Sequence, residues 1–355
     1  MEQEKKRNVV VEQITGIFVP IINYLTAASI IKSVIVVLGN AGILSLQSGV
    51  YRIFYGVSDG FFYFLPFFLA YTASKQWHTD RLLSMMIPAA MLYPDILEVL
   101  ENGGSMSFGG IPVNRAIYHS SVLPVLMAVG LLKFVEKPCD RLIPEAVRGF
   151  VKPILCCAVV LPVTFLLFGP IGTWIGDYLT ELFFLIYHWN PVVAGAFMGF
   201  LIQPMVVVGA HWSIVPICIN SIATVGYDVI LPLLGGAVYG QCGAALALGI
   251  LYKGQQEKRR MAFQGAFSAA IGVTEPTLFG VTVPQIRGML AACIGGAVGG
   301  AIAGIGGAHC TTFAFPSFLT CIAYIGPGFV WFLISMAVSF LVGFLLTMVQ
   351  RKWIR

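Results

Sequence analysis

The sequence predicts an all-α polytopic membrane protein. Its composition, its long apolar segments and the placement of its basic residues support this prediction. Of its 355 residues, 58% are hydrophobic and only 10% are charged, whereas a soluble domain carries about 25% charged residues. A soluble fold could not use so much apolar surface, because its water-facing positions need polar side chains. A lipid bilayer removes that requirement.

Nine apolar segments are long enough to be predicted as membrane spans, at about 20 residues per crossing. They are residues 14–39, 53–74, 82–100, 117–136, 150–170, 191–210, 228–252, 286–306 and 328–350. The 39 glycines suit membrane helices, since small residues let neighbouring helices approach closely.

Two further apolar segments, 211–227 and 262–285, are interrupted by Gly and Pro, and broken segments are predicted over 204–227 and 262–285. In the second of them, Gly272, Pro276, Gly280 and Pro284 disfavour a continuous helix. Non-helical backbone at membrane depth is stable only where protein buries it or where it lines a watery cavity. In transporters, broken segments of this kind mark the substrate site.

The basic residues predict the orientation of the chain. Most of the 21 Lys and Arg residues lie in five clusters that alternate with loops of little charge: up to Arg7, 75–81, 133–152, 253–260 and 351–355. The positive-inside rule therefore places both termini in the cytoplasm. An even number of spans must then join 253–260 to the C-terminus, so we expect 262–285 to turn back as a re-entrant hairpin.

The segment 171–190 is predicted to form an amphipathic helix that lies flat at the outer membrane interface or serves as a protein–protein face. One face carries its apolar residues, while Asp177 and Glu181 lie off that face. No long linker or repeat divides the chain, so residues 1–355 are interpreted as one membrane domain.

Several function classes are excluded by the sequence. The net charge of +5 comes from short breaks between apolar segments and not from a basic stripe with aromatics, so no nucleic-acid partner is expected. The eight cysteines form no CxxC pair and are interpreted as small buried hydrophobes. No Walker sequence, metal-ligand cluster or Ser/His/Asp triad occurs, so we expect no ATP-driven step, cofactor or metal.

Ionisable groups within apolar segments are costly and are therefore functional candidates. The strongest is Glu275, in the motif Gly272-Val273-Thr274-Glu275-Pro276 of the predicted hairpin. A carboxylate there could accept hydrogen bonds from two hydroxyls of a sugar. A structural ion pair with Arg287 explains the residue equally well.

Other candidates are weaker on their residue types alone. His211 can both donate and accept hydrogen bonds, and Trp212 offers an apolar face on which a sugar could stack. From the residue types alone, the interpretation as a buried structural His beside a packing Trp is slightly favoured. Asp59 is either a helix N-cap or a ligand contact. Gln203 by itself is uninformative. His309 either contacts a ligand or satisfies a Gly-rich turn, and the turn is favoured. Asp228 and Lys32 are interpreted as structural or interfacial.

These motifs resemble those of a known family. Residues 272–282 are similar to the G-I-T-E-P signature of glucose-superfamily IIC subunits of the bacterial phosphotransferase system. Residues 209–217 resemble that family's G-x-H-W and V-P-I segment. Residues 118–124, 168–172 and 226–233 are typical of its β-glucoside branch, although His119 replaces the usual Ser. The resemblance extends over essentially the whole chain, in order.

The resemblance implies a homodimer in the bacterial cytoplasmic membrane, with about ten transmembrane helices, re-entrant hairpins and an amphipathic interfacial helix in each protomer. Each protomer would have a scaffold part, roughly 9–190, and a substrate-binding part, roughly 191–350, that moves in an elevator-like way. A sugar would enter from outside, and a phosphocysteine on the partner IIB would phosphorylate its 6-hydroxyl. IIA, HPr and enzyme I would supply the phosphoryl group. No K-C-x-T-R loop occurs, so no IIB or IIA domain is expected within the chain.

Carried over by position, Glu275 and His211 match the family's sugar-binding carboxylate and histidine, and either could act as the catalytic base. Asp59 matches a less widely shared acidic contact, and Gln203 stands where some relatives have an arginine. Thr274 and Trp212, their neighbours in the motifs, complete the expected substrate-binding residues.

Two other functions stay open at this point. The chain could be a facilitator or secondary transporter that moves a sugar without phosphorylation, or a sensor built on a degenerate permease. The intact motifs argue against the sensor. The expected sugar is a β-glucoside such as salicin, arbutin or cellobiose.

Overall fold

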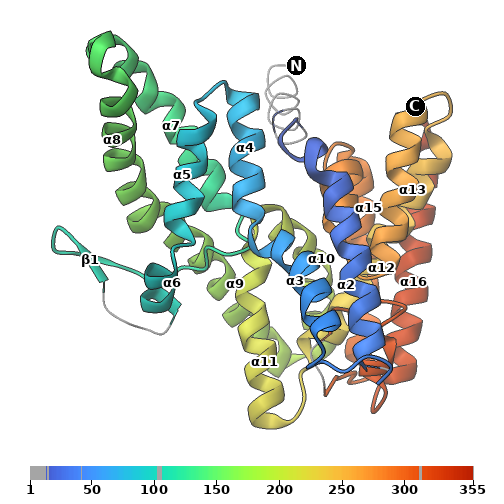
Figure 1. The fold of residues 1–355 in the computed structure, drawn as a ribbon. Coiled ribbons are helices and arrows are strands. Elements are labelled where there is room, and N and C mark those ends of the chain that lie inside the picture. The colour runs from blue at the N-terminus through green and yellow to red at the C-terminus, as the bar shows by residue number, and fades with distance from the viewer. Residues whose placement is uncertain (1–12, 14–15, 41, 102–105, 312–313, 355) are drawn as a thin grey trace.

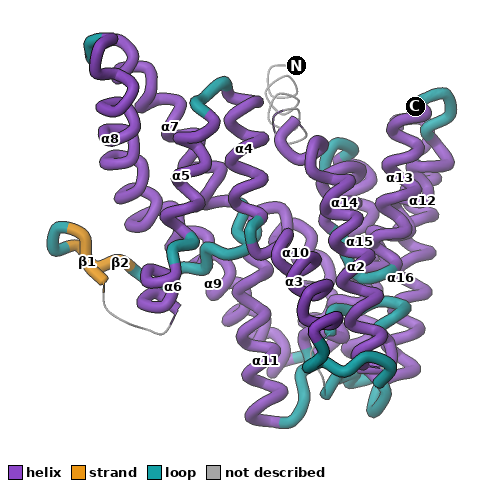
Figure 2. Tube along the Cα trace, viewed as in Figure 1, coloured by secondary structure: helices purple, strands orange, loops and turns teal. Residues whose placement is uncertain are grey.

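The computed structural model describes residues 13, 16–40, 42–101, 106–311 and 314–354, so the N-terminal basic residues fall outside the described part. The described chain is mainly helical. Figure 1 shows α4, α5, α7 and α8 grouped on one side and α2, α12, α13, α15 and α16 on the other, with α3, α9, α10 and α11 between them. Figure 2 shows that loops interrupt the helices mainly around the second group and at a short hairpin.

The first half of the chain contains nine helices and one hairpin among its described residues. They are η1 (Val19–Ile21), α2 (Ile22–Asn40), α3 (Gly49–Tyr63), α4 (Leu65–Trp77), α5 (Arg81–Met91), α6 (Pro94–Glu101), the strands β1 (Met106–Phe108) and β2 (Ile111–Val113), α7 (Leu123–Leu142), α8 (Glu145–Val163) and the π-helical η2 (Thr164–Phe168). The two strands are antiparallel, with Met106 opposite Val113. This hairpin was not predicted from the sequence.

The second half begins with α9 and contains the packed bundle. Its elements are α9 (Gly169–Trp189), α10 (Pro191–Val208), η3 (Ala210–Ser213), α11 (Ile214–Val225), α12 (Ile230–Leu251), α13 (Gln256–Ala270), α14 (Glu275–Thr277), the π-helical η4 (Leu278–Thr282), α15 (Ile286–Ile305), η5 (Cys321–Tyr324), α16 (Phe329–Val349) and α17 (Arg351–Ile354). The bounds of α12, α15 and α16 agree closely with three predicted spans.

Two predicted single spans are bent helix pairs, which corrects the sequence analysis. The segment 53–74 contains α3 and α4, which meet at 46°, and 82–100 contains α5 and α6, which meet at 45°. Pro66 lies in the first turn of α4, and Pro94 begins α6. Proline suits the first turn of a helix, where its missing N–H has no partner to lose, and it disfavours a helical residue before it. Each helix therefore restarts in a new direction.

Five helical segments among the described residues are long and apolar enough to cross a membrane, or up to seven if each bent pair is one span. The number of about ten transmembrane helices stays a prediction. One of the five is a continuous run of 45 residues, from Glu145 to Trp189, in which η2 joins α8 to α9. At about 1.5 Å per residue it is much longer than the hydrocarbon thickness of about 30 Å. The interfacial position expected for 171–190 stays a prediction.

The bundle of α10, α12, α15 and α16 is held together by glycines at which backbones touch. A Cβ built on Gly300 would lie 2.0 Å from the carbonyl oxygen of Gly195, and one on Gly296 would lie 2.2 Å from that of Gly199. A Cβ on Gly343 would lie 2.4 Å from the carbonyl oxygen of Gly240. Only glycine permits such an approach, which brings the dispersion contacts of whole backbones together.

The predicted breaks in 204–227 and 262–285 are confirmed. Gly209, at φ +80°, ends α10 in the left-handed region before η3 turns the chain into α11. Gly272, at φ +98°, lies in the turn between α13 and α14. Residues 270–285 are therefore not an unbroken helix. That the second segment re-enters the membrane stays a prediction.

Candidate functional site

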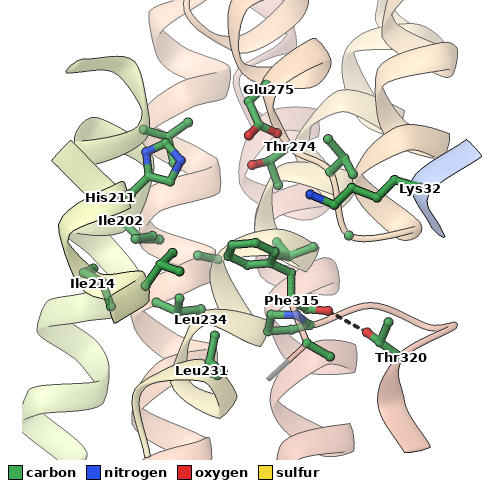
Figure 3. A pocket seen from close by; sticks show the side chains of 18 of the residues that line it. Lys32, Ile202, His211, Ile214, Leu231, Leu234, Thr274, Glu275, Phe315 and Thr320 are labelled. Atoms are coloured by element: carbon green, nitrogen blue, oxygen red, sulfur yellow. Dashed lines mark hydrogen bonds between the residues drawn. The ribbon is translucent and has the colours of Figure 1, made fainter. Parts of the chain in front are cut away.

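A cavity of about 210 Å³ lies where the two broken segments meet α2, α3, α10 and α12. One water molecule needs only about 10–15 Å³ of such space, so the cavity admits a much larger solute. Figure 3 shows side chains from both broken segments and from α2 directed into it. Its lining residues include Lys32, Tyr55, Phe62, Gln203, His211, Leu234, Thr274, Glu275, Phe315 and Thr320.

Glu275 is positioned by the turn that precedes α14. Gly272 adopts φ +98°, and a Cβ there would lie 2.8 Å from the side chain of Ser317. Ser268 Oγ donates to the carbonyl oxygen of Val273 at 2.9 Å, which ties the turn to the end of α13. Glu275 then begins α14, and its carboxylate is directed toward the cavity (Figure 3).

The interpretation of Glu275 as a partner of Arg287 is not supported. Arg287 is described but is not among the residues that line the cavity, whereas the ammonium of Lys32 is directed into the same space as the carboxylate. Glu275 therefore faces a cavity that already contains a cation. Its oxygens can accept hydrogen bonds from a polar solute.

His211 enters the cavity from the opposite broken segment. Because Gly209 turns the chain at the end of α10, the imidazole is carried by η3 and lies across the cavity from Glu275 (Figure 3). The two residues are 64 positions apart, and only the fold places them around one space. Trp212 lies in η3 as well, but its side chain is outside the described part of the structure.

Gln203 is almost completely buried and is fixed at both ends of its amide. Its Nε2 donates to the carbonyl oxygen of Ala237 at 3.2 Å, and its Oε1 accepts from Gln241 Nε2 at 3.2 Å. These bonds hold α10 to α12 at the wall of the cavity. The amide retains one N–H and further acceptor capacity.

Asp59 and Lys32 differ from their sequence-based interpretations. Asp59 lies inside α3 and not at its start, so it is not an N-cap; that position belongs to Ser48. It does not line the cavity, although it bonds Lys32 Nζ at 2.7 Å. Lys32, interpreted as structural or interfacial, does line the cavity.

Aromatic and aliphatic side chains form most of the remaining wall, including Tyr55, Phe62 and Phe315, which the sequence analysis missed. Thr320 Oγ1 donates to the carbonyl oxygen of Phe315 at 2.5 Å and shapes this part of the wall (Figure 3). The Pro-containing segment around Phe315 was the available signal, since irregular backbone between spans needs a cavity or protein around it. Apolar walls with a few polar groups are typical of small-molecule sites.

Two candidates lie elsewhere, as expected for structural residues. Asp228 accepts a hydrogen bond from the backbone N–H of Leu231 at 2.8 Å and pairs with Cys310 in a β-bridge, so it anchors the start of α12. His309 packs against the ring of Tyr227 at 4.9 Å. Among the described residues, no group of three or more His, Cys, Asp or Glu is placed to hold a metal ion.

Comparison with known proteins identifies what this chain resembles. Residues 15–296 match the family model of the phosphotransferase system EIIC proteins. A β-glucoside-specific EIIBCA component of Dickeya chrysanthemi is 36% identical over 92% of this chain and 53% of its own length. A β-glucoside-specific EIIBCA component of Bacillus subtilis is 33% identical over 96% of this chain and 56% of its own length.

An arbutin-, cellobiose- and salicin-specific EIIBC component of Escherichia coli is 30% identical over 96% of this chain and 72% of its own length. The chain spans about half the length of the EIIBCA relatives that it matches. The agreement extends across both broken segments up to residue 296 and includes the motifs that carry Glu275 and His211.

Proposed function

The chain belongs to the EIIC family of the phosphotransferase system and is a membrane protein of the β-glucoside type; from that premise we propose how it acts. It binds a β-glucoside-like sugar in the cavity between the two broken segments and carries it across the cytoplasmic membrane by alternating access. It then presents the sugar's 6-hydroxyl to a phosphorylated IIB partner. The names of the EIIBC and EIIBCA relatives support both the sugar class and the partner.

The observation that carries this proposal is the position of Glu275 and His211 across one cavity with largely apolar walls. A sugar presents hydroxyls that must be paired with hydrogen-bond partners when water is removed, and C–H faces that pack against apolar side chains. A carboxylate accepts hydroxyl protons, and a histidine can donate and accept. The cavity therefore offers what a neutral, hydroxyl-rich solute needs.

In the phosphorylation step, the oxygen of the 6-hydroxyl attacks the phosphorus of the phosphocysteine on IIB. The P–O bond forms as the P–S bond breaks, and the electron pair stays with the sulfur as a thiolate on IIB. The proton of the hydroxyl passes to Glu275 or His211, whichever faces it in the bound state. Such a transfer needs chiefly the alignment of a held hydroxyl with the donor.

Transport is thereby driven by phosphorylation and not by an ion gradient. The sugar phosphate is charged and cannot recross the bilayer. We further propose that the protein works as a homodimer with both termini in the cytoplasm. We also propose a scaffold part up to about residue 190 and a moving part from about residue 191. Helix α2 belongs to the scaffold part and contributes to the site.

The first test is sugar binding by purified protein in detergent, with arbutin as the probe. Glu275→Gln and His211→Ala are each expected to weaken binding by at least about tenfold, because each leaves sugar hydroxyls without a partner. The matched control is Glu98→Gln, at an exposed carboxylate of α6, which is expected to bind like the parent. Parent-like affinity in both cavity variants would refute the site.

The second test separates phosphotransfer from facilitated transport. Vesicles containing the protein receive phosphorylated IIB on the cytoplasmic face and labelled arbutin on the other. Arbutin phosphate is expected on the IIB side only when phospho-IIB is present. If arbutin crosses unmodified at the same rate with and without phospho-IIB, the chain is a facilitator.

A further inference from the structure

An ion pair between α2 and α3 reaches the wall of the cavity. Lys32 Nζ lies 2.7 Å from Asp59 Oδ1, and the two residues are 27 positions apart. Lys32 lines the cavity, whereas Asp59 stands behind it and does not. A charged side chain inside an apolar helix is costly. The charge is paired with Asp59 and lies at a cavity, not in the packed interior, so a ligand in the cavity can reach it.

The direction of the ammonium is constrained on its other sides. Its nitrogen lies 5.8 Å from the ring centre of Tyr55 and 5.4 Å from that of Phe62, within the range of cation–π attraction. Asp59 accepts one of its three N–H donors. Figure 3 shows the side chain extending into the cavity toward Thr274 and Glu275. The remaining donors therefore face the space where a solute would lie.

Lys32 supplies a charged donor on the side of the cavity toward Glu275. Glu275, when ionised, can only accept, one N–H of the Gln203 amide is already bonded, and His211 enters from the opposite broken segment. A sugar hydroxyl that donates its proton to a carboxylate still has an oxygen that must accept. The Lys32 ammonium is placed to supply that bond, so one hydroxyl can lie between a cation and an anion.

We propose that Lys32 is a sugar-binding residue, which donates to a hydroxyl that Glu275 accepts from, and that Asp59 is a positioning residue that holds the ammonium. This inference rests on the proposed function and deepens it. It assigns to Lys32, from α2, the contact that the family resemblance suggested for Asp59. A neutral pyranoside is the class of ligand that this pairing of one cation and one anion fits.

The central experiment measures arbutin binding to the purified full chain carrying Lys32→Met. Affinity is expected to fall roughly 10- to 150-fold, the loss that follows from removing one charged hydrogen bond. Lys32→Arg retains the charge and is expected to recover part of the affinity. The matched control is Lys152→Met, which breaks a Lys–Asp pair of 2.9 Å with Asp140 between α7 and α8, outside the cavity. It is expected to bind like the parent.

The role of Asp59 is tested by a double-mutant cycle. Asp59→Asn alone is expected to weaken binding less than Lys32→Met, because the ammonium is still present. In the Lys32→Met background, Asp59→Asn is expected to cause no further loss, since Asp59 acts only through Lys32. Equal losses in both backgrounds would show that Asp59 contacts the sugar itself and would overturn its assignment. The double variant removes both charges together, so it keeps the test available if Lys32→Met alone does not fold.

A series of monodeoxy β-glucosides gives a readout that a purely structural role would not change. The analogue that lacks the contacted hydroxyl is expected to bind equally to the parent and to Lys32→Met, whereas the other analogues still distinguish them. If Lys32→Met binds arbutin like the parent while Glu275→Gln does not, the inference about Lys32 fails and the proposed function stands. If the parent binds neither arbutin, salicin nor cellobiose, the proposed function itself fails.

Discussion

Glycine has opposite tasks in the bundle of α10, α12, α15 and α16 and in the broken segments beside it. In the bundle, Gly300 and Gly296 are in helical conformation, and each matters because it has no side chain where another backbone passes. In the broken segments, Gly209 and Gly272 matter because their φ angles are positive. The first use lets the helix backbones of the bundle pack in direct contact. The second ends helices and presents His211 and Glu275 to a cavity.

The comparison indicates how the protein combines stability with a polar site. Helix interiors satisfy their own backbone groups, so the bundle needs few polar side chains. Helix ends leave backbone groups free and let the chain change direction. His211, Thr274 and Glu275 therefore reach the cavity from the breaks, whereas Lys32 and Gln203 reach it from the helices α2 and α10.

The largest expected effect is in the bundle. Gly300→Ala would place a Cβ 2.0 Å from the carbonyl oxygen of Gly195, a backbone atom that cannot rotate away. We expect the variant to lose at least about 3 kcal/mol of stability, the upper end of the usual cost of overpacking. The measurement is the thermal unfolding of purified protein in detergent, followed by the loss of its monodisperse peak.

The control for this prediction is Gly149→Ala in α8, where an added Cβ has nothing within 4 Å. Because alanine favours a helix over glycine, this control is expected to be neutral or stabilising by up to about 1 kcal/mol. If Gly300→Ala were as stable as Gly149→Ala, the close approach of α10 and α15 would be wrong.

An intermediate effect is expected in the turn before Glu275. Gly272→Ala forces an L-residue into the left-handed region, at about 1–2 kcal/mol, and brings a Cβ within 2.8 Å of Ser317. We expect weaker arbutin binding together with the loss of stability, because the turn that positions Glu275 must shift.

Gly254→Ala provides the matched comparison, since its φ is +85° but the space around it is open. It lies in the loop between α12 and α13, away from the cavity. It is expected to lower stability by a similar backbone cost while leaving arbutin affinity unchanged. If Gly272→Ala and Gly254→Ala bound arbutin with equal affinity, the turn at Gly272 would not be needed to position Glu275.

The smallest effect is expected where the broken segment 204–227 joins α12 of the bundle. Asp228→Ala removes the carboxylate that accepts from the N–H of Leu231 at 2.8 Å. We expect a loss of about 1 kcal/mol, the usual net value of one hydrogen bond, with arbutin affinity retained. Asp228→Asn keeps an acceptor and is expected to lose less. A thermal scan in which Asp228→Asn is less stable than Asp228→Ala would contradict the role of this hydrogen bond.

Much of the site was predictable because it depends on local signals. The Gly and Pro residues of 262–285 and 204–227 predict the breaks, and an acid or histidine beside a break is visible in the sequence. The bounds of α12, α15 and α16 followed from unbroken apolar runs of spanning length. These features need only a count of residue types along one segment.

Other features were missed because their local signals were ambiguous or too short. The bends at α3–α4 and α5–α6 contain prolines that also occur inside continuous helices here, such as Pro153 and Pro162 in α8. The presence of proline therefore did not distinguish a bend from a continuous helix. The hairpin of β1 and β2 is too short for a pattern of alternating burial to identify it.

By itself, the sequence determined that this chain is a membrane protein, that its helices break at Gly209 and Gly272, and that Glu275 and His211 stand beside those breaks. Hydrophobicity and backbone freedom are properties of single residues and their neighbours, so they can be read along the chain. The tertiary structure alone decided that Lys32 and not Asp59 reaches the cavity, and that Gly300 lies against Gly195. Contacts such as these depend on how distant helices pack, and no local pattern encodes which backbone will pass at contact distance.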